Sequence, residues 1–396
     1  MGLSNLLGYL MVLLLTRTLG PADFGGYTAL STYGVLLAIP AGAFQVVVAR
    51  RLAGRDGPAA ERTSGVLPAL LLGLIFFAVT AAASPLLTDV FHLASNWSAV
   101  FLAAMLPPMM ATGCFQGILL GTGRLRALSL LYLTTALTRL AAAWVCAHLD
   151  LAVHQVFIAM FVASALTALT GAWLTRATLR DLPGTGHGLA AEMLRSNSTL
   201  AAYVALTNVD VLLARHFLDP QHSGGYALAS TFGRAMCWGT QFIALIIVPR
   251  MHRANPTRTL LRASALVVVI GAVGAGLIAI DPGFWITMAG GAEFTEYGSL
   301  ALICVLLGIA WALAQVWLFS EMSSNSHVLG LLTWAVIAAQ VLLIWFVAHD
   351  SPGQIVAVCL TGAVLIAVAG FVRVVRMHSG GANSAVDELL VVADRP

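Results

Sequence analysis

Apolar runs long enough to cross a lipid bilayer recur along the whole of this 396-residue chain. A helix crossing about 30 Å of hydrocarbon needs about 20 mostly apolar residues, because each residue rises about 1.5 Å. Twelve such runs lie near residues 2–17, 26–49, 65–86, 98–120, 128–148, 154–176, 198–216, 226–249, 263–280, 298–320, 327–348 and 354–372. The sequence therefore predicts an all-α membrane protein of about twelve transmembrane helices.

Charged residues are too scarce to cover a water-facing surface. They make up 9% of the chain, whereas a soluble domain carries about 25%. The net charge of +3 is too small and too dispersed for a nucleic-acid binder. The five cysteines each stand alone in an apolar run, which predicts core residues and no metal site. Without a P-loop, nucleophile elbow, HExxH or GxGxxG motif, we expect neither an enzyme nor a cofactor.

The arginines indicate how the helices are oriented. Two lie within apolar runs, Arg139 and Arg234, and two at helix ends on one side, Arg17 and Arg215. The other sixteen follow even-numbered runs or lie in the tail: Arg50, Arg51, Arg55, Arg62, Arg124, Arg126, Arg176, Arg180, Arg195, Arg250, Arg253, Arg258, Arg262, Arg373, Arg376 and Arg395. The positive-inside rule then predicts that both termini are cytoplasmic. Residues 377–396, small and polar before a brief apolar patch, are predicted to be a disordered cytoplasmic tail.

The second half of the chain repeats the first at an offset of 199 residues. Segment 25–34 (GGYTALSTYG) aligns with 224–233 (GGYALASTFG), with six identical pairs and one aromatic pair. Gln116 aligns with Gln315 at the same offset, and Arg17 corresponds to Arg215 one residue out of register. Because six runs separate the copies, the halves share one orientation. We predict two six-helix lobes, 1–196 with its connecting cytoplasmic loop and 197–376, around a central cavity.

One segment resembles a family signature. Residues 16–27 (TRTLGPADFGGY) are similar to the R-x-LG-P-x-x-FG-x-Y motif between the first two helices of bacterial polysaccharide transporters and O-antigen-type flippases. Residues 116–124 (QGILLGTGR) resemble the end of their fourth helix, whereas the second-half copy, RHFLDPQHSG at 215–224, departs from the signature. These proteins belong to the multidrug/oligosaccharidyl-lipid/polysaccharide exporter superfamily, in which two six-helix bundles alternate access to a cavity.

The resemblance implies a multi-pass transporter of the bacterial plasma (inner) membrane. It would flip a lipid-linked oligosaccharide from the cytoplasmic to the outer leaflet, among membrane lipids, with a polysaccharide polymerase or glycosyltransferases as candidate partners and without nucleic acid. Two alternatives stay open at this point. One is a cation-coupled multidrug antiporter on the same scaffold, with Asp210 as the cation ligand. The other is a non-transporting scaffold for polysaccharide assembly.

Charged side chains within the predicted spans are the candidate substrate-binding residues. A charge at the middle of a bilayer helix costs about 2.5–3.5 kcal/mol on insertion scales, so it usually faces a cavity or a partner. Three residues meet this description: Arg139, Arg234 and Asp210. Three further candidates are Asn208, which lies close to Asp210, and Arg17 and Arg215, which lie at the outer helix ends. Arginine binds phosphate through two hydrogen bonds, so a cationic cavity suits a phosphate or pyrophosphate. Alternatively, Asp210 forms a structural ion pair with Arg234 or Arg215, and the terminal arginines snorkel to the interface.

Two further sets of residues are candidates for a gate or a hinge. Gln116 and Gln315, near the inner ends of their helices, either line an inner gate or hydrogen-bond between helices. The glycine pairs Gly25 and Gly26, and Gly224 and Gly225, either let the backbone bend as the lobes move or allow close helix packing.

Overall fold

A computed structural model describes residues 2–53, 64–182, 189–247, 256–323 and 328–393. Throughout these ranges the regular structure is helical, without strands. The elements are α1 (Gly2–Leu37), α2 (Ile39–Ala53), α3 (Val66–Ala82), α4 (Ser84–Val90), α5 (Asn96–Gly121), α6 (Leu125–His148), α7 (Val153–Asp181), α8 (Leu189–Leu206), α9 (Val209–Phe217), α10 (Pro220–Ile247), α11 (Pro256–Ile280), α12 (Pro282–Gly290), a short 3₁₀ helix η3 (Ala292–Tyr297), α13 (Gly298–Ser323), α14 (Val328–Phe346) and α15 (Pro352–Ala393).

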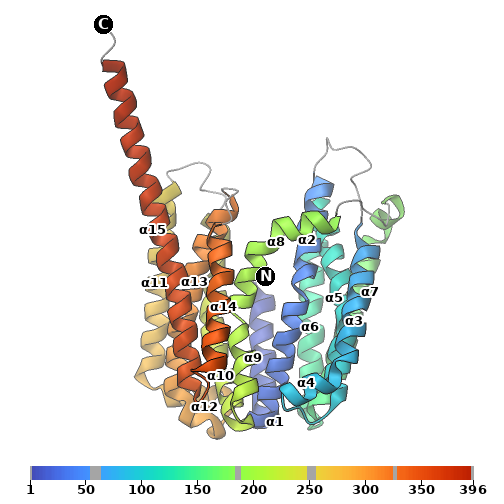
Figure 1. The fold of residues 1–396 in the computed structure, drawn as a ribbon. Helices are drawn as coiled ribbons and strands as arrows, with labels where there is room; N and C mark the ends of the chain where they lie inside the picture. The colour runs from blue at the N-terminus through green and yellow to red at the C-terminus, as the bar shows by residue number, and fades with distance from the viewer. Residues whose placement is uncertain (1, 54–63, 183–188, 248–255, 324–327, 394–396) are drawn as a thin grey trace.

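The helices form two groups joined at the middle of the molecule (Figure 1). Helices α2 to α7 lie on one side and α9 to α15 on the other, and α8 crosses near the upper end between them. Helix α1 lies between the groups, where it packs extensively against both α6 and α10. Segments from the two halves of the chain therefore meet along α1 and α10.

Each of the twelve predicted runs overlaps a helix, but fewer helices are long and apolar enough to span a bilayer. By length and composition the described residues contain eight such helices, or nine if the pair α3 and α4, bent by 61°, is one span. The first two runs fall within one continuous stretch, Leu6–Ala53. The run over 198–216 falls on α8 and α9, and the run over 226–249 falls on α10. None of these three helices is among the eight candidate spans. The all-helical membrane class is confirmed, and the number twelve stays a prediction.

Two local breaks shape the helices around the middle of the molecule. In α1, Gly20 has φ 66°, a left-handed conformation that glycine adopts without steric cost, and Pro21 follows it. Between α8 and α9 the chain leaves the helix at Thr207 and Asn208. Both breaks free backbone groups that need other partners, because hydrocarbon offers none.

The C-terminal tail continues the last helix. Helix α15 runs without interruption to Ala393 and projects beyond the other helices (Figure 1), and disorder over 377–396 stays a prediction. Residues 377–393 contain no proline and include Ala, Leu and Glu, which favour helices. A helix that starts in the last apolar run can therefore extend through them. Five of the arginines used to predict orientation, Arg55, Arg62, Arg250, Arg253 and Arg395, lie outside the described residues.

Candidate functional site

A cavity of about 300 Å³ lies between α1, α5, α6, α7 and α10. We call it the large cavity. Arg139 of α6 and Arg234 of α10 both line it, together with Asn208 from the break before α9. Much of the remaining lining is apolar or aromatic, including Met105, Met160, Phe24, Phe157 and Trp238. The two arginines predicted inside the hydrocarbon thus reach one chamber, from opposite halves of the chain.

Arg139 is the cation without a protein partner in this chamber. Its side chain makes no hydrogen bond or ion pair with any residue that the structure describes, and it is partly exposed within the cavity. A guanidinium group carries five N–H donors, and leaving them unpaired away from water costs free energy. Arg139 is therefore set up to bind an anion that enters the chamber.

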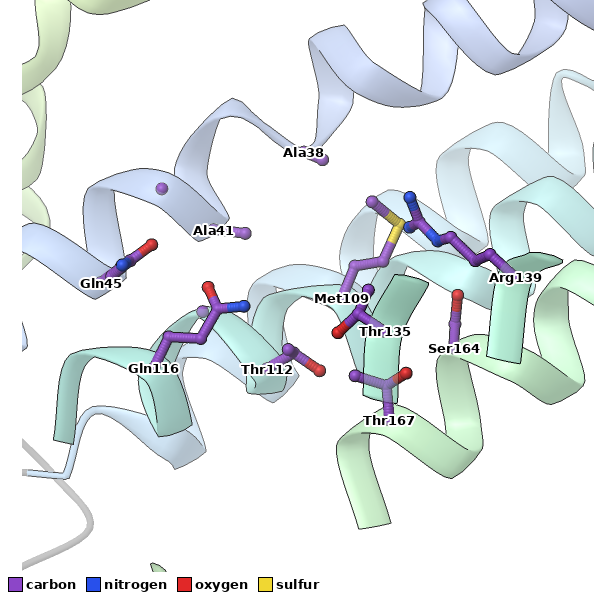
Figure 2. Close-up of a pocket in the computed structure, with 12 residues that line it drawn as sticks. Ala38, Ala41, Gln45, Met109, Thr112, Gln116, Thr135, Arg139, Ser164 and Thr167 are labelled. Carbon is purple, nitrogen blue, oxygen red and sulfur yellow. The ribbon is translucent and has the colours of Figure 1, made fainter. Parts of the chain in front are cut away.

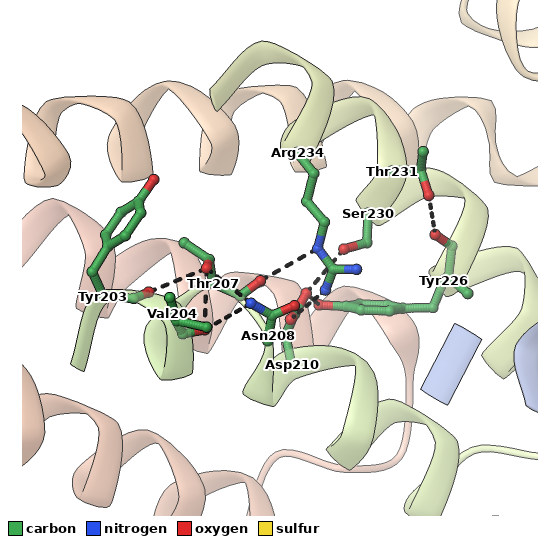
Figure 3. Close-up of polar contacts among 10 residues, drawn as sticks. Tyr203, Val204, Thr207, Asn208, Asp210, Tyr226, Ser230, Thr231 and Arg234 are labelled. Carbon is green, nitrogen blue, oxygen red and sulfur yellow. Dashed lines mark hydrogen bonds and ion pairs between the residues drawn. The ribbon is translucent and has the colours of Figure 1, made fainter. Parts of the chain in front are cut away.

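Arg234, in contrast, is already paired. Its Nη2 lies 3.3 Å from Oδ1 of Asp210, and its Nε donates to the carbonyl oxygen of Thr207 at 3.3 Å (Figure 3). Thr207 lies at the break between α8 and α9, so the guanidinium satisfies a carbonyl at the place where the helix is interrupted. Asp210 is fully buried, and the exposed fraction of the Arg234 side chain is 12%. The structure therefore has the ion pair that the sequence left as an alternative.

The carboxylate of Asp210 is surrounded by donors from one face of α10. Tyr226 donates its hydroxyl to Oδ2 at 3.2 Å, and Ser230 donates at 3.1 Å. Tyr226, Ser230 and Arg234 are four residues apart, a spacing that places side chains on one helix face. Asp210 itself lies in the first turn of α9, where the helix dipole stabilises negative charge. Arg234 and Asp210 together add little net charge, so the positive character of the large cavity comes from Arg139.

A second, smaller chamber of about 220 Å³ adjoins the first, which we call the polar cavity. Arg139 and Met109 line both chambers. The polar side chains around it are Gln45 of α2, Thr112 and Gln116 of α5, Thr135 of α6, and Ser164 and Thr167 of α7 (Figure 2). Gln116, predicted to be near an inner gate, is thus a lining residue. Gln315, its repeat equivalent, is buried in α13 and lines neither of these two cavities.

Arg215 and Arg17 do not reach the large cavity. Arg215 is buried, and its guanidinium donates to the carbonyl oxygens of Phe91 (2.7 Å), His92 (2.9 Å), Ala22 (3.1 Å) and Pro220 (3.4 Å) and to Ser223 Oγ (2.8 Å). These contacts join the end of α9 to the start of α10, to α1 and to the connection after α4. Arg17 is exposed and donates to the carbonyl oxygen of Met288 in α12. Neither arginine lines the large cavity, because nearer backbone carbonyls bind both side chains, and a substrate-binding role for them stays a prediction.

The first glycine of each pair lies at a close contact between α1 and α10. A Cβ on Gly25 would lie 2.9 Å from the backbone N of Gly224, and a Cβ on Gly224 would lie 1.8 Å from the carbonyl oxygen of Pro21. Gly26 faces the Arg215 guanidinium, and Gly225 faces the ring of Tyr297. Only glycine fits at such distances. The structure thus shows close packing at these positions, and a hinge role for them stays a prediction.

Sequence reasoning missed one buried acid at the other end of the helices. Glu321, at the end of α13, forms an ion pair with Arg373 of α15 and accepts from the backbone N–H groups of Leu329 (2.9 Å) and Gly330 (3.0 Å) in the first turn of α14. The carboxylate thereby connects three helices. The sequence does show a single acidic residue directly after the run 298–320, which could have indicated a buried charge, but it does not indicate which residues pair with it.

Comparison with known proteins decides the family. Residues 1–255 match the model of the polysaccharide biosynthesis protein family. The chain belongs to this family. No curated protein sequence matches it.

Several solved transporter structures share the fold of this chain. An inward-facing multidrug-resistance MATE transporter of the MOP superfamily superposes with a TM-score of 0.72 at 14% identity, covering 96% of each chain. The lipid II flippase MurJ in an inward closed conformation superposes with a TM-score of 0.71 at 11% identity, covering 100% of this chain and 92% of MurJ. A MOP-superfamily transporter from Pyrococcus furiosus gives 0.60 at 17% identity, covering 95% and 91%. This polysaccharide biosynthesis family member thus has the MOP-superfamily transporter fold.

Proposed function

We propose that this protein flips a lipid-linked oligosaccharide from the cytoplasmic to the outer leaflet of a bacterial inner membrane. The observation that carries the proposal is Arg139, a cation without a protein partner in a chamber lined by both halves of the chain. A phosphate or pyrophosphate linkage between lipid and sugar would supply the missing acceptors, because Arg binds phosphate oxygens through two parallel hydrogen bonds. The transporter carries the substrate and performs no chemistry on it.

The transport cycle rests on twelve helices in two six-helix lobes. The contact between Gly25 and Gly224 supports this arrangement, because equivalent residues of two copies touch each other only near the axis that relates the copies. The lobes would rock against each other around the fixed site and expose Arg139 to each side in turn. The ends of α2 and α7 and the projecting end of α15 lie toward one end of the molecule (Figure 1). We assign that end to the cytoplasm, and we propose that both termini lie on the cytoplasmic side.

The second candidate function, a cation-coupled multidrug antiporter, draws on the fold shared with the MATE transporter. A coupling cation would need Asp210, whose carboxylate already accepts from Tyr226, Ser230 and Arg234. A cation could bind only by displacing a guanidinium group, which favours the flippase. An Asp210→Asn change that abolished drug resistance while polymer export continued would reverse this preference.

The test of the proposed function is complementation of polysaccharide export in cells lacking the gene. Arg139→Ala should abolish export without loss of the protein from the membrane, and Arg139→Lys should retain part of it, because Lys keeps the charge but not the two-pronged geometry. Arg126→Ala is the matched control: Arg126 lies on the same helix and is exposed to solvent. Arg139→Ala combined with Arg234→Ala should likewise abolish export. Full export by the Arg139→Ala protein would refute the proposal and favour a non-transporting scaffold, which recruits a polymerase or glycosyltransferases.

A further inference from the structure

The polar cavity is lined by groups that match a ligand rich in hydroxyls. The hydroxyls of Thr112, Thr135 and Thr167 donate to carbonyl oxygens of their own helices at 2.7, 2.8 and 2.9 Å, so each presents free acceptor lone pairs. The amide nitrogen of Gln45 donates to Tyr132 at 2.8 Å, which leaves its carbonyl oxygen as an acceptor. No carboxylate belongs to this lining, so the cavity does not select a cationic ligand.

Two lining residues are left to be satisfied by a ligand. Ser164 is buried, with 5% of its surface exposed, and its Oγ has no hydrogen-bond partner among the described residues. Gln116 makes no side-chain hydrogen bond within the described part of the chain, so its amide offers two donors and an acceptor. Buried polar groups in proteins are nearly always paired. Their arrangement around one chamber therefore points to a polar occupant.

Arg139 stands where this polar chamber meets the large one. The large cavity has methionine and aromatic walls, and methionine adapts its shape to irregular apolar ligands. The shared position of Arg139 places a phosphate-binding group between a hydroxyl-binding compartment and an apolar one. This order corresponds to the order of parts in a sugar-phosphate-lipid molecule.

We propose that the polar cavity is a saccharide subsite, which binds the sugar ring next to the phosphate held by Arg139. The inference rests on the proposed function and specifies how its substrate lies in the protein. The volume of about 220 Å³ is below the range of about 300–1,000 Å³ for pockets that bury a drug-sized ligand. We therefore assign one sugar ring to this cavity, with the remaining sugars extending out of it.

Three glycines allow each compartment to be filled separately. A Cβ added at Gly42, Gly8 or Gly239 would meet no atom within 4 Å. Gly42 lines the polar cavity and Gly8 the large cavity, whereas Gly239 is exposed on α10 and lines neither. All three have helical backbones, in which leucine is favoured over glycine. Gly42→Leu and Gly8→Leu therefore fill one chamber each, and Gly239→Leu is the matched control.

The experiment measures the binding of two probes to the purified protein in lipid nanodiscs. Dodecyl phosphate carries the chain and the phosphate, and glucosyl dodecyl phosphate adds one sugar ring. The wild-type protein should bind the sugar-bearing probe about three- to tenfold more tightly than dodecyl phosphate, which is the gain expected from one or two net hydrogen bonds. Gly42→Leu should remove this advantage and leave the binding of dodecyl phosphate within about twofold of wild type. Gln116→Leu should reduce the advantage, Gly239→Leu should preserve it, and Gly8→Leu should weaken both probes.

Other outcomes separate the subsite from the proposed function. If the sugar gives no advantage in the wild-type protein, or if Gly42→Leu weakens both probes equally, the saccharide subsite is refuted. If dodecyl phosphate still binds in an Arg139-dependent way in that case, the anion site survives without the subsite. If dodecyl phosphate does not bind, or binds equally well to Arg139→Ala, the proposed function and the subsite are refuted together.

Discussion

Replacing Arg234 by methionine should strongly destabilise this protein. The substitution leaves the carboxylate of Asp210, which is fully buried, without its ion-pair partner. The hydroxyls of Tyr226 and Ser230 still donate to it, but the positive charge is gone. Breaking a buried ion pair by removing one partner costs about 3–5 kcal/mol. We expect Arg234→Met to lower the free energy of unfolding by that amount.

A second substitution isolates the contribution of the buried charge. Asp210→Asn is neutral and keeps an oxygen that can accept from Tyr226 and Ser230. Hydrogen bonds to a charged group contribute about 1.5–3 kcal/mol and neutral ones about 0.5–1.5, so weakening the two hydroxyl bonds should cost about 2–3 kcal/mol. In the protein carrying both substitutions no unpaired carboxylate remains. It should therefore be more stable than Arg234→Met alone by about 2 kcal/mol.

The assay is reversible unfolding in mixed micelles at increasing mole fraction of dodecyl sulfate, applied to all four proteins of this double-mutant cycle. The coupling energy from the cycle reports the pair itself. A loss below about 1 kcal/mol for Arg234→Met, or a double variant less stable than both single ones, would show that the carboxylate is solvated or protonated and that our account of the pair is wrong.

Three further outcomes are expected. Arg215→Lys should lower the thermal unfolding midpoint in detergent, because one ammonium group cannot reach the five acceptors that the guanidinium contacts; an unchanged midpoint would contradict this. Gly224→Ala should reduce the yield of folded protein in size-exclusion chromatography, since its Cβ would lie 1.8 Å from a backbone oxygen, whereas Gly42→Ala, in open space, should be tolerated. Glu321→Gln should lower the unfolding midpoint through loss of the ion pair to α15, and equal stability would argue against its role in joining three helices.

The membrane class was readable from the sequence because it depends on local composition. A run of about 20 apolar residues is helical in a bilayer whatever surrounds it, since backbone groups must be satisfied within the segment. Every predicted run does overlap a helix. The helix breaks were harder to place. The interruption at Thr207 and Asn208 is tolerated because Arg234, from the next long helix, satisfies a carbonyl there.

The sequence by itself singled out Arg139, Arg234 and Asp210, because each is a charged residue within an apolar run. Only the tertiary structure decided what each of them does. It pairs Arg234 with Asp210, binds Arg215 to backbone carbonyls and leaves Arg139 facing the chambers. The physical reason is one of range: the insertion cost of a charge depends on its own position in the helix, whereas its partner depends on distances of a few ångströms to residues far away in the chain.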